Sequence, residues 1–194
     1  MARPKQISDE RLKLVARKVF LEKGVNTPVA VVAKELGVTP AALFHRAKSK
    51  ERLISLALWP PDPPELEHLQ QGPSGQNAVH DDLVEILYRL NSYFALAVPA
   101  IFLLHMGGVK PGKPNEDKQA EKMPAMLRLR RGLAGWLQQA AASRKLQSGN
   151  PRIAAEALLG AMEARHLHGY LAGKKFSTVQ NRTFTRALIE EVLH

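Results

Sequence analysis

A cluster of cations lies close to a row of small side chains in residues 38–53, VTPAALFHRAKSKERL. The cations are Arg46, Lys48, Lys50 and Arg52. Lysine and arginine at this density can neutralise phosphates, and arginine and histidine can also hydrogen-bond to base edges. The small residues ahead of them would allow this segment to approach the groove of a nucleic acid closely. This stretch therefore has the chemistry of a nucleic-acid contact.

The side chains that a helix here would expose differ in what they can recognise. Pro40, Ala41 and Ala42 have no side-chain hydrogen-bonding group, so they can only contact thymine methyl groups or permit a close approach. His45 and Arg46 could bond to base edges. We therefore expect base reading by hydrogen bonds to come mainly from these last two residues.

Other polar side chains nearby are expected to meet the phosphate backbone. Lys48 and Lys50 are suited to phosphate contacts, which orient a protein without reading sequence. The hydroxyls of Thr27 and Thr39 could do the same, but both threonines precede prolines at helix starts, and capping alone would explain them. The basic arm at residues 2–6 could reach DNA or remain a solvated tail.

The positive charge is concentrated at one end of the chain. The 194 residues are 45% hydrophobic and 24% charged, as in soluble globular proteins, and their net charge is +10. Residues 1–58 carry 12 Lys/Arg against 5 Asp/Glu, a net +7, whereas residues 59–194 carry 16 against 13, a net +3. Nucleic acid is the leading candidate partner for the basic end, although general solubility would also explain the bias.

Several compartments and site chemistries are disfavoured by the composition. The chain has no cysteine, which excludes disulfides, thiolate zinc sites and a cysteine nucleophile and fits a reducing cytoplasm. The N-terminus lacks an apolar signal region, and no uninterrupted apolar run approaches the ~18 residues of a membrane span. We therefore expect a cytoplasmic protein without a membrane partner.

Catalytic and metal-binding patterns are weak. No glycine-rich phosphate loop, paired-carboxylate set or Ser/His/Asp spacing stands out. Glu163 and His166 could share a metal at i, i+3, but the second such motif that a helical bundle site needs is missing. We expect no enzyme activity, no cofactor and no metal.

Helical periodicity with clear start and stop signals predicts four helices in residues 1–58. Ser8 is a good N-cap for the first helix, and Gly24 ends it. Thr27-Pro28, Thr39-Pro40 and Ser49 start the next three. The apolar stripe of the first helix is Leu12, Val15, Ala16, Val19 and Phe20.

The second and third helices are separated by only Gly37 and Val38, so they must cross steeply. Such a crossing needs a small residue at the contact, which Ala33 supplies, and a glycine at the reversal. The buried faces would be apolar: Val32, Leu36, Val38 and Leu43. This pattern favours a helix-turn-helix whose second helix enters the major groove, with an ordinary helical hairpin as the alternative.

The segment of about 50 residues that contains these helices resembles the N-terminal domain of TetR-family transcriptional regulators. The resemblance consists of the A…F…G spacing of the first helix (Ala16, Phe20, Gly24), the AKELGVT turn, and the SKE.L start at Ser49. It implies an all-α homodimer with an N-terminal three-helix helix-turn-helix domain that binds a palindromic operator. It also implies a C-terminal helical bundle for ligand binding and dimerisation, and in most members repression relieved by the ligand.

Three positions depart from the family's Y-x-H-F motif. Phe44 stands where the family has tyrosine, so it lacks a phosphate-binding hydroxyl and is expected only to pack. Arg46 replaces the histidine and could make a stronger, charged phosphate contact. Ala47 replaces the phenylalanine. A further departure is the run of prolines after Trp59, where the family has a continuous connection between domains.

The remainder of the chain predicts a linker and a bundle. Residues 59–77 contain five prolines and leave room for only a short helical stretch, so we expect domains at 1–58 and 78–194 with a Pro-rich linker between them. Helices are expected from about 79 until an end or kink at Pro99, then at roughly 118–146, 151–172 and after Ser177, which with Gln180 forms a capping box.

Two sets of residues are candidates for function in the bundle. The first could line an apolar ligand pocket, with core packing as the alternative: Tyr93, Phe94, Phe102, Met106, Leu133, Trp136, Met162 and His166. The resemblance implies a dimer interface from the last two helices, with intrachain packing as the alternative: Ala157, Gly160, Ala161, Ala164, Phe184, Leu188, Ile189 and Val192.

The main hypothesis is a ligand-responsive repressor whose partners are double-stranded DNA, a second copy of the chain and a small, largely apolar effector. One alternative is a basic helical adaptor that meets an acidic protein. Another is a nucleoid-type DNA binder with little sequence preference.

Overall fold

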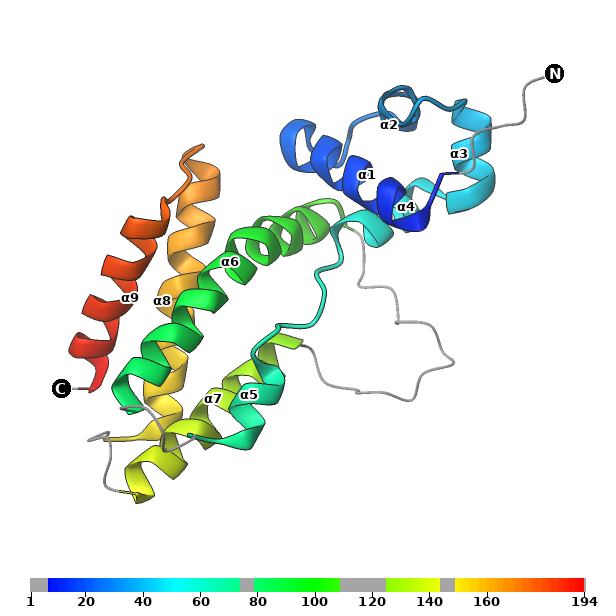
Figure 1. Ribbon diagram of the computed structural model, residues 1–194. Helices are drawn as coiled ribbons and strands as arrows, with labels where there is room; N and C mark the ends of the chain where they lie inside the picture. Colours follow the sequence, from blue (N-terminus) through cyan, green and yellow to red (C-terminus); the bar gives the residue numbers. More distant parts are fainter. Residues whose placement is uncertain (1–6, 74–78, 109–124, 144–148, 194) are drawn as a thin grey trace. The chain divides into compact units, whose positions relative to one another are not determined.

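The computed structural model describes residues 7–73, 79–108, 125–143 and 149–193 (Figure 1). The described residues are helical, with turns and irregular connections and no strand among them, which confirms the all-α class. The helices are α1 (Asp9–Lys23), α2 (Val29–Leu36), α3 (Pro40–Ala47), α4 (Lys50–Leu58), α5 (Leu66–Gln71), α6 (Val79–Met106), α7 (Ala125–Ala142), α8 (Pro151–Leu171) and α9 (Thr178–Leu193).

These helices form two compact units. Among the described residues, the first unit contains 7–60 and 99–108, and the second contains 61–98 and the residues from 125 onward. The single helix α6 therefore contributes to both, because its last residues from Pro99 group with the N-terminal helices. A Cβ added at Gly107, just after α6, would come within 3.0 Å of Val25, so this end of α6 packs on the α1–α2 turn.

In the first unit, α1 packs on α2 and α4, and α3 packs on α2 and α4. The buried face of α1 is the apolar stripe that its sequence predicts, except that Val15 is half-buried. Ser8 accepts a hydrogen bond from the backbone N–H of Arg11, 3.2 Å away, and Gly24 ends the helix with φ of 81°. Local signals thus set the bounds of α1, and its apolar face fixes it in the core.

The second unit is a bundle in which α5 packs on α7, α7 on α8, and α8 on α9. Asn150 caps α8 by accepting from the N–H groups of Arg152 and Ile153. Ser177 and Gln180 bond to each other's backbone N–H groups at 3.2 and 2.8 Å, forming the expected capping box. The short α5 lies inside the stretch predicted as a linker.

Helix α6 continues through Pro99 to Met106 rather than ending at the proline. An 18-residue window of α6 has mean hydropathy 1.5, so by length and composition this helix could cross a membrane. Half of that window is buried within the structure. A core helix of a helical protein has these same properties.

Candidate nucleic-acid interface

The turn between α2 and α3 is built as its sequence predicts. Gly37 has φ of 72° and ψ of 36°, a left-handed conformation that glycine adopts without the steric cost of a Cβ. The N–H of Val38 donates to the carbonyl of Ala33 at 3.0 Å, closing the turn. Thr39 then accepts from the N–H of Ala42 at 3.2 Å, and Pro40 occupies the first helical position. These contacts fix where α3 begins relative to α2.

Burial divides α3 into two faces. Leu43 and Ala47 are buried, together with Val32, Ala33 and Leu36 of α2, so α3 is anchored through one narrow face. The residues that α3 exposes are Pro40, Ala41, Ala42, Phe44, His45 and Arg46, followed by Lys48. Apart from Phe44, the exposed positions of α3 are those that the sequence predicts to face outward.

Phe44 does not pack as its sequence context predicts. Its side chain is 45% exposed. Successive residues on a helix point about 100° apart, so Leu43 and Ala47 occupy the core face and leave Phe44 outside it. An aromatic ring is thus available on the outward face, where it can make apolar contact with a partner such as a thymine methyl group.

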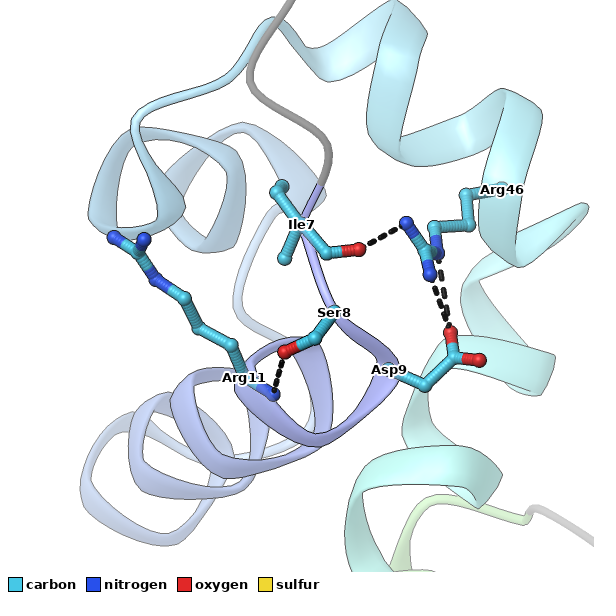
Figure 2. A network of polar contacts seen from close by, with 5 residues as sticks. All are labelled: Ile7, Ser8, Asp9, Arg11 and Arg46. Carbon is cyan, nitrogen blue, oxygen red and sulfur yellow. Dashed lines mark hydrogen bonds and ion pairs between the residues drawn. The ribbon is translucent and has the colours of Figure 1, made fainter.

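Arg46 points its guanidinium at the start of α1 (Figure 2). Its Nε and Nη2 both donate to Asp9 Oδ1, at 3.1 and 2.7 Å, and its Nη1 donates to the carbonyl of Ile7. The sequence predicts that this side chain contacts base edges or phosphate, whereas here three of its N–H donors bond to Asp9 of α1 and to Ile7 just before it. Nothing in the local pattern of α3 signals a partner 37 residues away.

Two other predicted phosphate contacts also have partners within the protein. Lys50 Nζ donates to the carbonyl of Asn26 at 3.1 Å. The hydroxyl of Thr27 is buried and lies 2.8 Å from the carbonyl of Gly24 and 3.1 Å from that of Lys23. Thr27 therefore does not cap α2, whose N-cap is Pro28 without a side-chain bond, and it stabilises the α1–α2 turn instead.

Lys48 lies at the end of α3 with its side chain exposed. Its φ of 71° is the one positive value for a residue other than glycine among those that the structure describes. A side chain with a Cβ adopts this conformation at a cost, and such positions often occur at functional sites. Lys48 is thus an exposed cation held in a strained backbone conformation between α3 and α4. The basic arm at residues 2–6 lies outside the described residues.

The ligand candidates divide into two groups. Six are buried in the second unit: Tyr93, Phe94, Leu133, Trp136, Met162 and His166. The other two, Phe102 and Met106, belong to the first unit, where Phe102 is half-buried and Met106 is 70% exposed. The structure therefore brings the six together in one bundle and does not bring the last two into it.

A buried polar network crosses this bundle. Asn91 Nδ2 donates to Thr185 Oγ1 at 2.8 Å and to the carbonyl of Leu87, so its Oδ1 accepts from His166 Nε2 at 3.1 Å. Burial, reinforced by the charge of Arg165, lowers the pKa of His166 to about 4, so the imidazole is neutral at pH 7. The network ties α6, α8 and α9 together, and no spacing rule on a single helix could have found Asn91 and Thr185.

Trp136 carries a different kind of buried polar group. It is fully buried on α7, and its Nε1 has no hydrogen-bond partner among the described residues. A buried indole N–H normally finds an acceptor. Within the described ranges, no group of three or more His, Asp and Glu side chains is arranged to hold a metal.

The dimer candidates are mostly at the surface of the chain. Ala157 and Ala164 are exposed on α8, and Gly160 and Ala161 between them are half-buried. On α9, Phe184, Leu188 and Val192 are half-buried. Ile189 is fully buried, so it belongs to the core of its own chain and has no surface to offer a partner.

The N-terminal unit matches a known family. Residues 14–57, which contain the helix-turn-helix just described, match the family model of bacterial regulatory proteins, tetR family. A TetR-family regulator from Thermus thermophilus, PfmR, matches over 97% of both chains with a TM-score of 0.65 and 22% identity. Residues 14–57 thus carry the N-terminal domain of the tetR family. Proteins of this family are DNA-binding regulators of transcription rather than enzymes.

Other solved structures share the fold over nearly the full length. FadR from Bacillus subtilis, a transcriptional regulator in complex with stearoyl-CoA, has a TM-score of 0.64 and 14% identity, with 96% of this chain and 98% of that chain covered. A TetR-like regulator from Rhodococcus sp. RHA1 has a TM-score of 0.64 and 17% identity, with 97% of each chain covered. No curated protein is a significant match in sequence.

Proposed function

We propose that this chain is a TetR-family regulator, a cytoplasmic repressor that binds a palindromic operator as a homodimer and is released by a small molecule. The observation that carries the proposal is the exposed face of α3, which begins at a helix-turn-helix turn and presents small and aromatic side chains. Such a slim face suits the major groove, where alanine and phenylalanine can contact thymine methyl groups.

A homodimer would support operator recognition because it presents two copies of α3 to the DNA. Two recognition helices related by a two-fold axis read half-sites about 34–36 Å apart, one turn of DNA. Ala157, Gly160, Ala161 and Ala164 form a stripe of small side chains on α8, which would let a second copy approach closely. The exposed Ile153 and Leu171 near the two ends of α8 add apolar area to the same helix.

The effector is expected to carry a long apolar chain. The B. subtilis FadR structure holds stearoyl-CoA, and the second unit of this chain has an interior rich in apolar and aromatic side chains, including Phe94, Trp136 and Met162. The indole Nε1 of Trp136 lacks an acceptor among the described residues, and a carbonyl of an acyl group would supply one. We therefore propose a fatty acyl thioester as the effector class.

The test begins with selection of bound duplexes from a random DNA pool by the full chain. The enriched duplex is then used in binding assays with and without stearoyl-CoA. We expect a palindromic motif and a loss of binding when stearoyl-CoA is added, with free coenzyme A as the control. Equal binding to the enriched duplex and to a scrambled one would instead indicate a nucleoid-type binder, and failure to enrich any duplex would contradict DNA binding.

A further inference from the structure

The contacts of Arg46 use three of the five N–H donors of its guanidinium. Three of its nitrogens donate within the protein: Nε and Nη2 to Asp9 Oδ1, and Nη1 to the carbonyl of Ile7 (Figure 2). We propose that Arg46 is a positioning residue that holds the recognition helix α3 against the start of α1, and that it does not read bases. The proposal rests on the proposed function in one respect, namely that α3 binds DNA.

The bridge joins two helices that otherwise pack on common neighbours. Both α1 and α3 pack on α2 and on α4. Arg46 lies in the last turn of α3, and Asp9 lies in the first turn of α1. Each charge has the sign that its own helix dipole favours at that end, so each helix end stabilises the charge that it carries. A guanidinium fork fixes a direction as well as a distance.

The pair also changes the charge that approaching DNA would meet. The side chain of Asp9 is 77% exposed and that of Arg46 is 38% exposed. An unpaired carboxylate near phosphates would repel them, whereas a carboxylate paired with a guanidinium presents almost no net charge. Arg46 therefore compensates Asp9, and the cation count of α3 overstates the charge available to phosphates.

Base recognition is then left to fewer groups. Among the outward residues of α3 itself, His45 remains as the side chain with a hydrogen-bonding group free of a described partner. Ala41, Ala42 and Phe44 can add only apolar contacts. The orientation of α3 therefore has a large influence on discrimination between DNA sequences. A hydrogen bond from one side chain to a base edge is lost when the helix tilts.

Substitution of the pair should leave the fold intact. Exposed ion pairs contribute little to folding stability, so loss of this one should not unfold the domain. The variants are R46Q, D9N and the double variant, and circular dichroism checks their helix content and melting. The probes are the duplex that the wild-type chain enriches from a random pool and a scrambled duplex of the same composition.

The readout is the ratio of the two dissociation constants, scrambled over enriched. We expect both R46Q and D9N to reduce this ratio, R46Q by about three- to tenfold, the range set by the net contribution of one hydrogen bond, and D9N by less, because Arg46 keeps its bond to the Ile7 carbonyl in D9N. The double variant should lose no more than R46Q alone, because R46Q already removes every bond between Arg46 and Asp9. The slope of log Kd against log salt should stay the same in R46Q.

A direct DNA contact by Arg46 predicts a different outcome. R46Q would then lower the ratio while D9N would leave it unchanged or raise it, and a phosphate contact would reduce the salt slope by about 0.9. Either result would overturn the positioning role. Failure of the wild-type chain to enrich any duplex would contradict the proposed function itself, and the role of the pair in DNA binding with it.

Two neighbouring residues provide matched controls. Glu10 and Arg11 lie in the same first turn of α1, are exposed, and have no side-chain bond to Arg46. In Figure 2 the Arg11 side chain points away from Arg46. E10Q repeats the charge change of D9N, and R11Q repeats that of R46Q. Both should leave the ratio unchanged, whereas equal losses in the controls would show that charge alone is responsible and would refute positioning.

Discussion

At the scale of single residues, His166 makes stability depend on pH. Burial keeps its pKa at about 4 in the folded chain, against 6.5 for an exposed histidine. Between these two pH values the unfolded chain binds a proton that the folded chain does not. The contribution of His166 to the free energy of unfolding is therefore fully present above pH 6.5 and falls as the pH drops toward 4. The expected loss from this residue is on the order of 3 kcal/mol.

Denaturant unfolding of the wild type and of H166Q between pH 4 and 7 measures this contribution. H166Q should flatten the dependence because glutamine keeps a donor toward Asn91 but does not ionise. H168Q is the control, since His168 is exposed on the same helix and should leave the dependence as it is. Identical pH dependence in the wild type and H166Q would contradict the assignment.

Lys48 combines backbone strain with an exposed charge that we propose contacts DNA. Its φ of 71° should be relieved by glycine, so K48G should be more stable than K48A by about 1 kcal/mol. Both variants lose the cation, so both should weaken binding to all duplexes alike and reduce the salt slope by about 0.9. Melting and salt-dependent binding assays separate these two effects. A K48G variant no more stable than K48A would refute the strain.

At the scale of helices, the exposed small-residue stripe of α8 predicts dimerisation. The double variant A157E/A164E places two carboxylates on this face, where they should separate the subunits by repulsion and bulk without entering the core. Light scattering after size-exclusion chromatography should show a monomer with unchanged helix content and weaker operator binding. A142E, at an exposed position of α7, is the control. A dimer retained by the double variant would exclude this face as the interface.

Helix positions were the most predictable part of the fold. Ser8, Thr39, Ser49 and Ser177 each accept the capping bond expected of them, because a cap is decided by residues three positions apart. The expectation that Thr27 caps α2 was wrong, because its hydroxyl donates instead to carbonyls at the end of α1. The tie between Arg46 and Asp9 could not be predicted, because it depends on tertiary approach across the unit.

At the scale of the whole molecule, the sequence predicts which side chains α3 exposes, but it does not predict that α6 contributes to both units. Prolines after Trp59 suggest a boundary in the linker, whereas the last residues of α6 group with the DNA-binding helices. Pro99 stands where this division falls, inside a helix that continues through it. Periodicity cannot reveal such sharing, since the same apolar pattern serves packing in either unit.

We propose above all that this chain recognises DNA through α3. Residues 1–58, whose net charge is +7, would support this binding by neutralising phosphates. The most direct test is the dissociation constant of the full chain for its enriched duplex and for a scrambled duplex between about 50 and 200 mM salt, the range over which such contacts weaken strongly. The account predicts affinity that falls steeply with salt for both duplexes and stays tighter for the enriched one. Binding that is independent of salt, or equal for the two duplexes at every salt concentration, would contradict it.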